Sequence, residues 1–283
     1  MIDIHTHLWN PETIPESIRS YFEEQGKKRF QSRFYTAEGL LERMDAAGIE
    51  KAVVLALAYD SSLTSDEIEQ INDYVVKETG KSSRLEAFCT VAPRDVEKAA
   101  DTLRKYIEVS GCKGLKLHGN MQEIFPNDPA CYPLYRIMEH YRKPVLFHTG
   151  GIGLRAYKDK YSGLEYFDDI ACDFPDMPII LGHAGRFEYE KMAVILRKHK
   201  NCYADISTNF SRKSALAVKP LERLVRTVEE WAGTTEQLLL GSDFPFYSQA
   251  KTMKYVNDAD TGEDLRNMLE RNTEIFCEKY KIF

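Results

Sequence analysis

The sequence has no excess of basic residues. Its 283 residues include 38 lysines and arginines against 44 aspartates and glutamates, which gives a formal net charge of −6. Nucleic acids are bound by basic surfaces that neutralise phosphates, so this balance argues against a nucleic acid as a general partner. We expect the partner to be a small molecule.

Long hydrophobic runs are also missing. No segment approaches the roughly 20 apolar residues that span a membrane, and the first residues lack the basic-then-apolar pattern of a signal peptide. With 43% hydrophobic and 29% charged residues, the composition is typical of a soluble globular protein. We therefore expect no membrane partner and a cytoplasmic location.

Paired cysteines and a nucleotide-binding glycine motif are absent as well. The six cysteines lie far apart and form no Cys-x-x-Cys pair, which argues against a thiolate zinc site and against a disulfide framework. No GxGxxG motif follows the first apolar segment, and this absence disfavours a dinucleotide-binding fold.

Apolar segments alternate with helical patterns along the whole chain. Strands this apolar, each followed by a helix, are typical of a parallel sheet that is covered on both faces. The predicted strands are 1–8, 51–57, 85–92, 113–118, 144–150, 178–185, 202–208 and 237–246. The predicted helices are 36–49, 65–79, 95–110, 131–141, 163–173, 188–199, 214–231 and 262–279.

Eight such repeats predict an α/β protein with a closed (β/α)₈ barrel, the TIM barrel, rather than an open sheet. We expect one domain over residues 1–283, with an inserted loop at about 9–35 after the first strand. In this fold, catalytic residues lie at the C-terminal ends of the strands.

Five of the seven histidines fall at predicted strand ends. They are His5, His7, His118, His148 and His183, and Asp243 joins them at the end of the last strand. His5 and His7 are two residues apart, so their side chains should project from the same face of the first strand. Each histidine alone could be an ordinary buried residue, but five of them at one rim indicate a site.

Imidazoles together with a carboxylate are a ligand set for a catalytic zinc or a similar divalent ion. No cysteine belongs to the set, which argues against a purely structural metal site. A barrel that binds a metabolite without converting it is the non-catalytic alternative.

The same motifs carry a family resemblance. His5–His7 (HTH), 114–119 (GLKLHG), 147–150 (FHTG), 182–185 (GHAG) and 241–246 (GSDFPF) resemble the amidohydrolase superfamily, and most of all its amidohydrolase-2 branch. That branch contains hydrolases, decarboxylases of the aminocarboxymuconate-semialdehyde type and metal-free lactonases. A TatD-type nuclease shares the first motif, but it has a glutamate ligand near the fourth strand, where this chain has GLKLHG.

The resemblance implies roles for individual residues. It makes His5, His7, His148 and Asp243 the metal ligands, and it gives proton transfer to Asp243 and His183. It implies one divalent metal ion, with zinc as the leading candidate, and it suggests a homodimer. Lys116 lies where two-metal relatives carry a carboxylated bridging lysine, although a contact with an anionic substrate fits the one-metal branch better.

Further residues near the strand ends are candidates for binding the substrate. They are Lys116, His118, Arg186, Arg155 and Trp9, because arginine and lysine at this face can hold a carboxylate and an aromatic residue can wall a pocket. Together these features predict a metal-dependent hydrolase that acts on a small carboxylate-bearing amide, ester or lactone. The alternative is a metal-dependent nonoxidative decarboxylase, a lyase, of a small unsaturated or aromatic acid.

Overall fold

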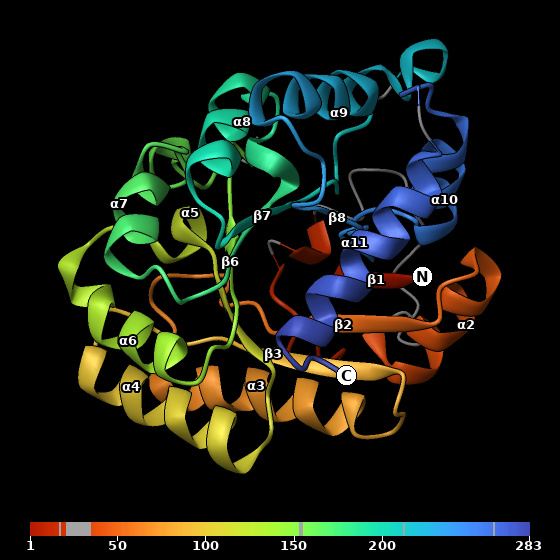
Figure 1. Cartoon of the computed structure of the whole chain (residues 1–283). Helices are drawn as coiled ribbons and strands as arrows, with labels where there is room; N and C mark the ends of the chain where they lie inside the picture. Colours follow the sequence, from red (N-terminus) through yellow and green to blue (C-terminus); the bar gives the residue numbers. More distant parts are fainter. Residues whose placement is uncertain (17, 21–34, 153–154, 212, 263) are drawn as a thin grey trace.

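Eight parallel strands form the centre of the molecule (Figure 1). The computed structural model describes residues 1–283 except 17, 21–34, 153–154, 212 and 263. Most of the insertion predicted at 9–35 therefore lies outside the described residues. The strands, each hydrogen-bonded to the next along the chain, are β1 (Ile2–Thr6), β2 (Lys51–Leu55), β3 (Leu85–Cys89), β4 (Gly114–Leu117), β5 (Val145–His148), β6 (Ile179–Gly182), β7 (Cys202–Asp205) and β8 (Leu238–Leu239).

Backbone hydrogen bonds join the last strand segment to the first and close the barrel. Ile4 N donates to Leu240 O at 3.0 Å, and Asp243 N donates to His5 O at 2.8 Å. His7 N then donates to Phe244 O at 2.7 Å. These bonds place the ends of β1 and β8 side by side, so that two histidines and Asp243 meet although they are more than 230 residues apart.

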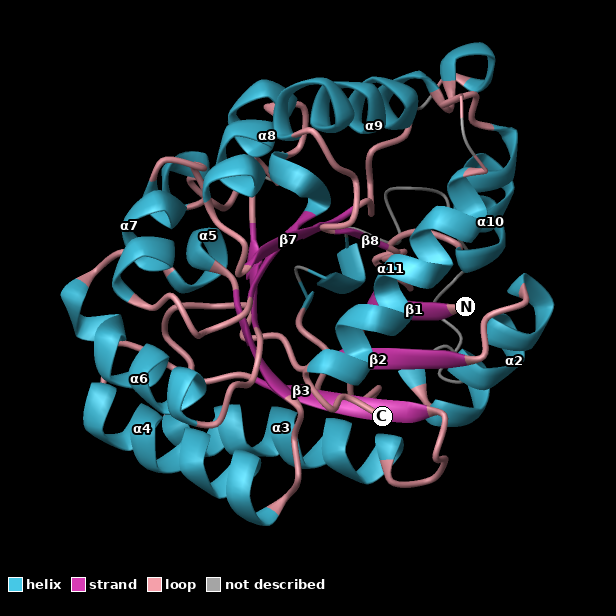
Figure 2. Cartoon of the chain, viewed as in Figure 1, coloured by secondary structure: helices cyan, strands magenta, loops and turns pink. Residues whose placement is uncertain are grey.

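Helices surround the barrel (Figure 2). They are α2 (Ala37–Ala47), α3 (Ser65–Thr79), α4 (Val96–Arg104), α5 (Gly119–Gln122), α6 (Tyr132–His140), α7 (Tyr166–Asp173), α8 (Tyr189–Lys198), α9 (Lys219–Ala232), α10 (Gln249–Asp258) and α11 (Leu265–Lys279). The predicted (β/α)₈ barrel is thus confirmed, with the short α5 and α10 as helices that were not predicted. Within the described part of the chain, every helix is too short or too polar to cross a membrane.

The half of the barrel interior near the N-terminal ends of the strands is filled with apolar side chains. Val53, Leu146 and Ile180 belong to a buried cluster inside the barrel, and Phe276 of α11 packs into it. This packing closes the N-terminal end of the barrel. The polar residues at the C-terminal strand ends consequently have a rigid apolar base beneath them.

Candidate active site

A pocket opens at the C-terminal ends of the strands, where the fold predicts a site. Its floor is polar and its walls are mostly apolar. The floor is formed by His5, His7, Lys116, His118, His148, His183, Thr208 and Asp243. The walls are formed by Ile18, Leu57, Met121, Ile152, Tyr157, Phe246 and Tyr247, and Arg186 also faces the pocket.

His5 and His7 are each oriented by a hydrogen bond on the outer ring nitrogen. His5 Nδ1 lies 2.9 Å from Asp205 Oδ2, and His7 Nδ1 lies 2.9 Å from the carbonyl oxygen of Leu55. Since both partners only accept, both Nδ1 atoms donate, and in the neutral rings the Nε2 atoms carry lone pairs. Burial lowers the pKa of His7 to about 4, which keeps its ring neutral at physiological pH.

These two lone pairs converge on the carboxylate of Asp243. His5 Nε2 lies 3.7 Å and His7 Nε2 lies 3.5 Å from Asp243 Oδ1, both longer than an ordinary hydrogen bond. One ligand atom from each residue lies within 4.8 Å of the other two. Two nitrogens and a carboxylate oxygen that face one another at distances too long for hydrogen bonds fit a divalent cation, and the bonds to Asp205 and Leu55 are the outer contacts that orient histidine ligands.

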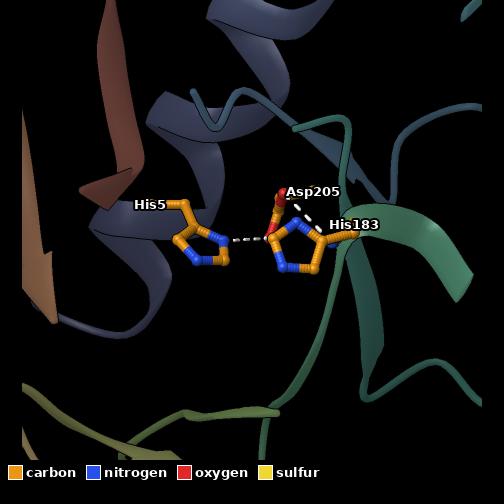
Figure 3. Close-up of side chains that lie close together, drawn as sticks. All are labelled: His5, His183 and Asp205. Atoms are coloured by element: carbon orange, nitrogen blue, oxygen red, sulfur yellow. Dashed lines mark hydrogen bonds and ion pairs between the residues drawn. The ribbon is translucent and has the colours of Figure 1, made fainter. Parts of the chain in front are cut away.

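Asp205 connects this group to His183 (Figure 3). Burial raises the pKa of Asp205, but the nearby His5 and hydrogen bonds from Ser207 outweigh this effect and hold that pKa below its usual value. The Ser207 hydroxyl therefore donates to Asp205 Oδ1 in a short hydrogen bond. Because that proton is used, His183 Nδ1, at 2.7 Å from Ser207 Oγ, must donate to Ser207.

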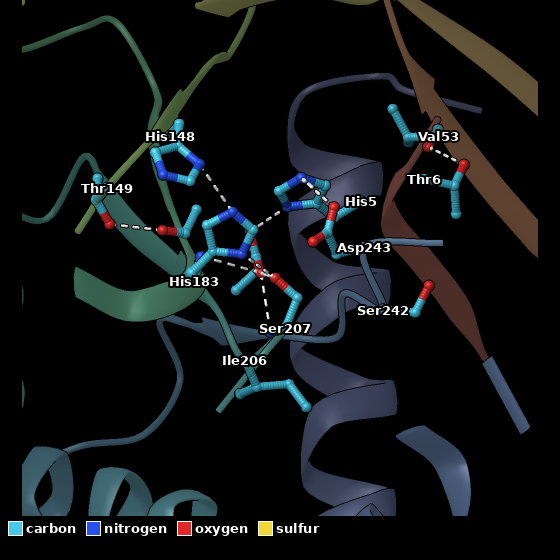
Figure 4. Close-up of polar contacts among 12 residues, drawn as sticks. His5, Thr6, Val53, His148, Thr149, His183, Ile206, Ser207, Ser242 and Asp243 are labelled. Atoms are coloured by element: carbon cyan, nitrogen blue, oxygen red, sulfur yellow. Dashed lines mark hydrogen bonds and ion pairs between the residues drawn. The ribbon is translucent and has the colours of Figure 1, made fainter. Parts of the chain in front are cut away.

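His148 lies next to His183 in this polar network (Figure 4). Its Nδ1 lies 3.0 Å from His183 Nε2, and its Nε2 lies 3.1 Å from the carbonyl oxygen of Gly150. Since the Gly150 carbonyl only accepts, His148 Nε2 donates to it, and in the neutral ring Nδ1 carries a lone pair that faces the lone pair of His183 Nε2. Ligation of a metal through Nε2 requires the bond to Gly150 to be released. The assignment of His148 as a ligand stays a prediction. The His118 ring stacks on His148, with centroids 3.8 Å apart.

Lys116 is buried in the pocket floor. Its side chain is 1% exposed, and its Nζ has no hydrogen-bond partner among the described residues. Burial lowers the pKa of Lys116 to about 8, against the attraction of Asp205 and Asp243. A buried ammonium group without a partner is unfavourable, and an anion in the pocket would compensate it.

Arg186 lies at the mouth of the pocket. Its Nη1 donates to Gly151 O at 2.5 Å and its Nη2 to Tyr247 Oη at 3.5 Å. No carboxylate of the described residues forms an ion pair with Arg186. Gly150, with φ of +76°, lies directly behind it, and a Cβ there would be 2.5 Å from Arg186 Cβ. Glycine at position 150 therefore leaves the space that the Arg186 side chain occupies at the mouth of the pocket.

Two other predicted substrate contacts lie elsewhere. Trp9 is buried behind His7, and their rings stack with centroids 5.7 Å apart; Trp9 does not belong to the described lining of the pocket. Arg155 lies in an exposed turn outside that lining. Contacts of these two residues with a substrate stay predictions, and the structure assigns Trp9 a supporting contact with His7.

Three polar residues of the site were not predicted from the sequence. Asp205 and Ser207 orient His5 and His183, and Thr208 lines the pocket. All three lie in the segment CYADIST, which was predicted only as a strand. An acidic residue in an otherwise apolar strand was the signal available, because charged residues are rarely buried without a partner.

The profile of a protein family described as Amidohydrolase matches residues 2–274. A search of curated proteins finds no match. Among solved structures, an uncharacterised TIM-barrel protein from Bordetella bronchiseptica is 18% identical, with a TM-score of 0.78, and the alignment covers 99% of this chain and 100% of that one.

Two further similar structures are named as decarboxylases. The 5-carboxyvanillate decarboxylase from Sphingomonas paucimobilis is 17% identical, with 100% of this chain and 99% of that chain covered and a TM-score of 0.72. A dihydroxybenzoic acid decarboxylase from a Polaromonas species, with bound manganese and the inhibitor 2-nitroresorcinol, is 16% identical, with coverages of 99% and 96% and a TM-score of 0.76. At these identities the likeness establishes the fold.

Proposed function

The chain belongs to the amidohydrolase-2 family, and on that premise we propose that it is a metal-dependent decarboxylase of a small aromatic or unsaturated acid. The observation that carries the proposal is the unpartnered ammonium group of Lys116 beside a cation site, at the floor of a pocket with apolar walls. Such a floor holds the carboxylate of a substrate, and the walls receive its carbon skeleton. The decarboxylases among the similar structures support this choice of reaction.

His5, His7 and Asp243 would hold the divalent ion. When bound, the ion supplies positive charge that orients the oxygen atoms of the substrate and withdraws electrons from the bond that breaks. Nitrogen and carboxylate ligands suit zinc, iron and manganese. Zinc was the ion predicted from the sequence, and manganese is the ion bound in the Polaromonas enzyme.

Lys116 and Arg186 bind the anionic substrate. Lys116 Nζ faces the pocket from the floor and pairs with the carboxylate there. Arg186 lies at the mouth of the pocket, where its positive charge attracts the anionic substrate. The bond between the carboxylate and its neighbouring carbon breaks, carbon dioxide leaves, and that carbon keeps the electron pair and takes a proton. We assign the delivery of this proton to Asp243, which receives it from an acidic group of the bound substrate.

His183 positions the reacting groups from the other side. Its Nδ1–H is held by Ser207, so the Nε2 atom is the one that can exchange a proton with His148. The Asp205 carboxylate at the far end of this chain of hydrogen bonds stabilises a positive charge on either ring. This arrangement can hold and release a proton while the substrate changes its charge.

Hydrolysis of a small carboxylate-bearing amide, ester or lactone is the second candidate. The family description, Amidohydrolase, favours it, and it would use the same ligand set with an activated water molecule. The two reactions differ in their products. Decarboxylation releases carbon dioxide without incorporating the oxygen of water, whereas hydrolysis adds that oxygen to a product.

The first experiment is to measure the metal content of protein that is purified without chelator or added metal. We expect about one ion per chain in the wild type, a loss of the ion in His5→Ala and His7→Ala, and no loss in the control His140→Ala, because His140 is exposed at the end of α6. His148→Ala tests the fourth predicted ligand. Unchanged metal content in the His5 and His7 variants would contradict the ligand assignment.

The second experiment follows the reaction itself. Metal-loaded protein is incubated in ¹⁸O-labelled water with aromatic carboxylic acids and, separately, with lactones and amides. Release of carbon dioxide, and a product without labelled oxygen, would support decarboxylation. A labelled carboxylate product would instead identify the chain as a hydrolase.

A further inference from the structure

Thr208 has an unusual backbone conformation beside the pocket. It follows β7 in the turn 206–209, and its φ is +62°. Left-handed backbone is rare for residues other than glycine, and for a β-branched residue such as threonine it is a genuine outlier. Conformations of this kind persist only where the surrounding structure enforces them, and they occur preferentially at functional sites.

The side chain of Asn209 enforces this conformation. Its Nδ2 donates to the carbonyl oxygens of His183, Ser207 and Ile206 at 2.9, 3.0 and 3.3 Å. Its Oδ1 accepts a hydrogen bond from the Tyr189 hydroxyl at 2.9 Å. Asn209 therefore ties the turn after β7 to the end of β6, and Thr208 lies between these anchored residues and the pocket.

The hydroxyl group of Thr208 has no hydrogen-bond partner among the described residues. The residue is 4% exposed, and it lines the pocket. Other buried threonines satisfy their hydroxyls internally: Thr149 donates to Gly182 O at 2.5 Å, and Thr273 donates to Leu269 O at 2.7 Å. A buried hydroxyl that lacks a partner is unfavourable unless a ligand supplies one.

Lys116 Nζ is also a buried polar atom of the described pocket lining that has no hydrogen-bond partner. Lys116 belongs to β4 and Thr208 follows β7, three strands further around a closed barrel of eight. The two groups therefore approach the pocket from strands that are not neighbours in the barrel. A ligand that satisfies both must carry an anionic group and, away from it, a hydrogen-bonding group.

We infer that Thr208 is a specificity-determining residue whose hydroxyl binds a polar substituent of the substrate, away from the carboxylate held by Lys116. The inference rests on the proposed function only in taking this pocket as the substrate site. It names the substrate class as a small acid with a hydroxyl or oxo group remote from the carboxylate.

The first test measures thermal unfolding of the ligand-free protein. Thr208→Val removes a hydroxyl that no residue binds, so we expect an unchanged or higher unfolding temperature. Thr273→Val is the matched control, because its hydroxyl also accepts from Leu240 N at 2.9 Å in the core, and we expect a lower unfolding temperature. A similar loss in both variants would overturn the inference, since it would mean that Thr208 already has a partner.

The second test measures binding to the manganese-loaded protein by calorimetry, with 4-hydroxybenzoate, 2-hydroxybenzoate and benzoate as probes. We expect Thr208→Val to weaken the binding of 4-hydroxybenzoate about tenfold, as for one lost hydrogen bond, and to leave the other two acids unaffected. Thr208→Ser, which keeps the hydroxyl, should retain the wild-type affinity.

Two outcomes would overturn the inference: equal effects of Thr208→Val on all three acids, or no binding of 4-hydroxybenzoate to the wild type. The absence of carbon dioxide release with binding as expected would instead refute the proposed reaction. The two failures are therefore distinguishable.

Discussion

Lys116 combines deep burial with the absence of any partner for its ammonium group. Its folded-state pKa of about 8 lies below the ordinary lysine value of 10.5 because burial penalises the charged form. Between these two values the unfolded chain binds more protons than the folded chain, so stability contributed by this group rises with pH across that window. At neutral pH the ligand-free protein is correspondingly less stable, by about 3 kcal/mol.

The substitution Lys116→Met tests this reasoning. We expect the variant to be more stable than the wild type at pH 7 and the difference to shrink as the pH approaches about 10, as measured by urea unfolding of the metal-free protein. Lys98→Met, at an exposed position on α4, should show no such pH-dependent difference. A constant difference between wild type and Lys116→Met from pH 7 to pH 10 would contradict a depressed pKa.

Asp205 acts on the candidate metal site through His5. Its carboxylate accepts from His5 Nδ1 and thereby directs Nε2 toward Asp243. We expect Asp205→Asn to bind manganese 10- to 100-fold more weakly, the usual effect of losing such an outer contact, measured by competition with a chelator. His7 provides the comparison, because its Nδ1 is held by a backbone carbonyl that the substitution leaves in place. An unchanged affinity would show that His5 does not contribute to binding the ion.

The contrast between His5 and Asp205 shows what sequence can predict at this scale. The five histidines were predictable because the ends of parallel strands meet at one rim of the barrel, whatever the details of packing. The only signal for Asp205 was an acidic residue in an apolar strand, and the roles of Asp205 and Ser207 were not predictable, since they depend on hydrogen bonds to residues more than 20 positions away in the chain. Spacing along one strand carries no information about such partners.

The junction between β1 and β8 depends on a buried carboxylate. Asp3 accepts from Ser242 N at 3.0 Å, Ser242 Oγ at 2.6 Å and Gln249 Nε2 at 2.8 Å, as well as from His5 N at 3.2 Å. One side chain thus links β1, the segment that carries Asp243, and α10. The geometry of the candidate metal ligands depends on this link.

We expect Asp3→Ala to destabilise the protein by roughly 3 kcal/mol, because several buried donors lose their acceptor, and to weaken metal binding as well. Ser242→Ala removes only the hydroxyl, and a smaller loss of about 1 kcal/mol is expected. Chemical unfolding and a metal titration measure the two effects. Equal destabilisation in both variants would show that Asp3 does not hold β1, the segment that carries Asp243, and α10 together.

The strands and most helices were predictable because their patterns are local. The helix α3 begins at Ser65 and ends at Thr79 as predicted, and Thr64 and Glu67 form a capping box at its start, a signal contained within four residues. The helix α10 was missed because Met253 and Val256 are its only buried large apolar residues. It packs against α2, and this tertiary contact is invisible in the local sequence.

At the scale of the whole molecule, the candidate site concentrates histidines whose neutral forms are favoured by burial. Burial lowers the pKa of His7 to about 4 and lowers the pKa values of His118, His148 and His183 well below 6.5. As the pH falls below about 6.5, these groups take up protons in the unfolded chain but not in the folded one. Stability should therefore fall with pH, by up to about 1.4 kcal/mol per pH unit for each histidine.

His118→Asn separates one of these contributions from the rest. His118 precedes α5, and its Nδ1 accepts from Met121 N at 3.4 Å, a capping role that asparagine can also fill. We expect the unfolding free energy of this variant to depend less steeply on pH between about 6.5 and 4, because one proton fewer is taken up on unfolding. Urea unfolding of the metal-free protein measures this slope. A slope equal to that of the wild type would mean that His118 is protonated in the folded state. The loss of stability at low pH would then arise from the other buried histidines alone. This loss should still become smaller when manganese is added, since a metal ion occupies lone pairs that protons would otherwise take.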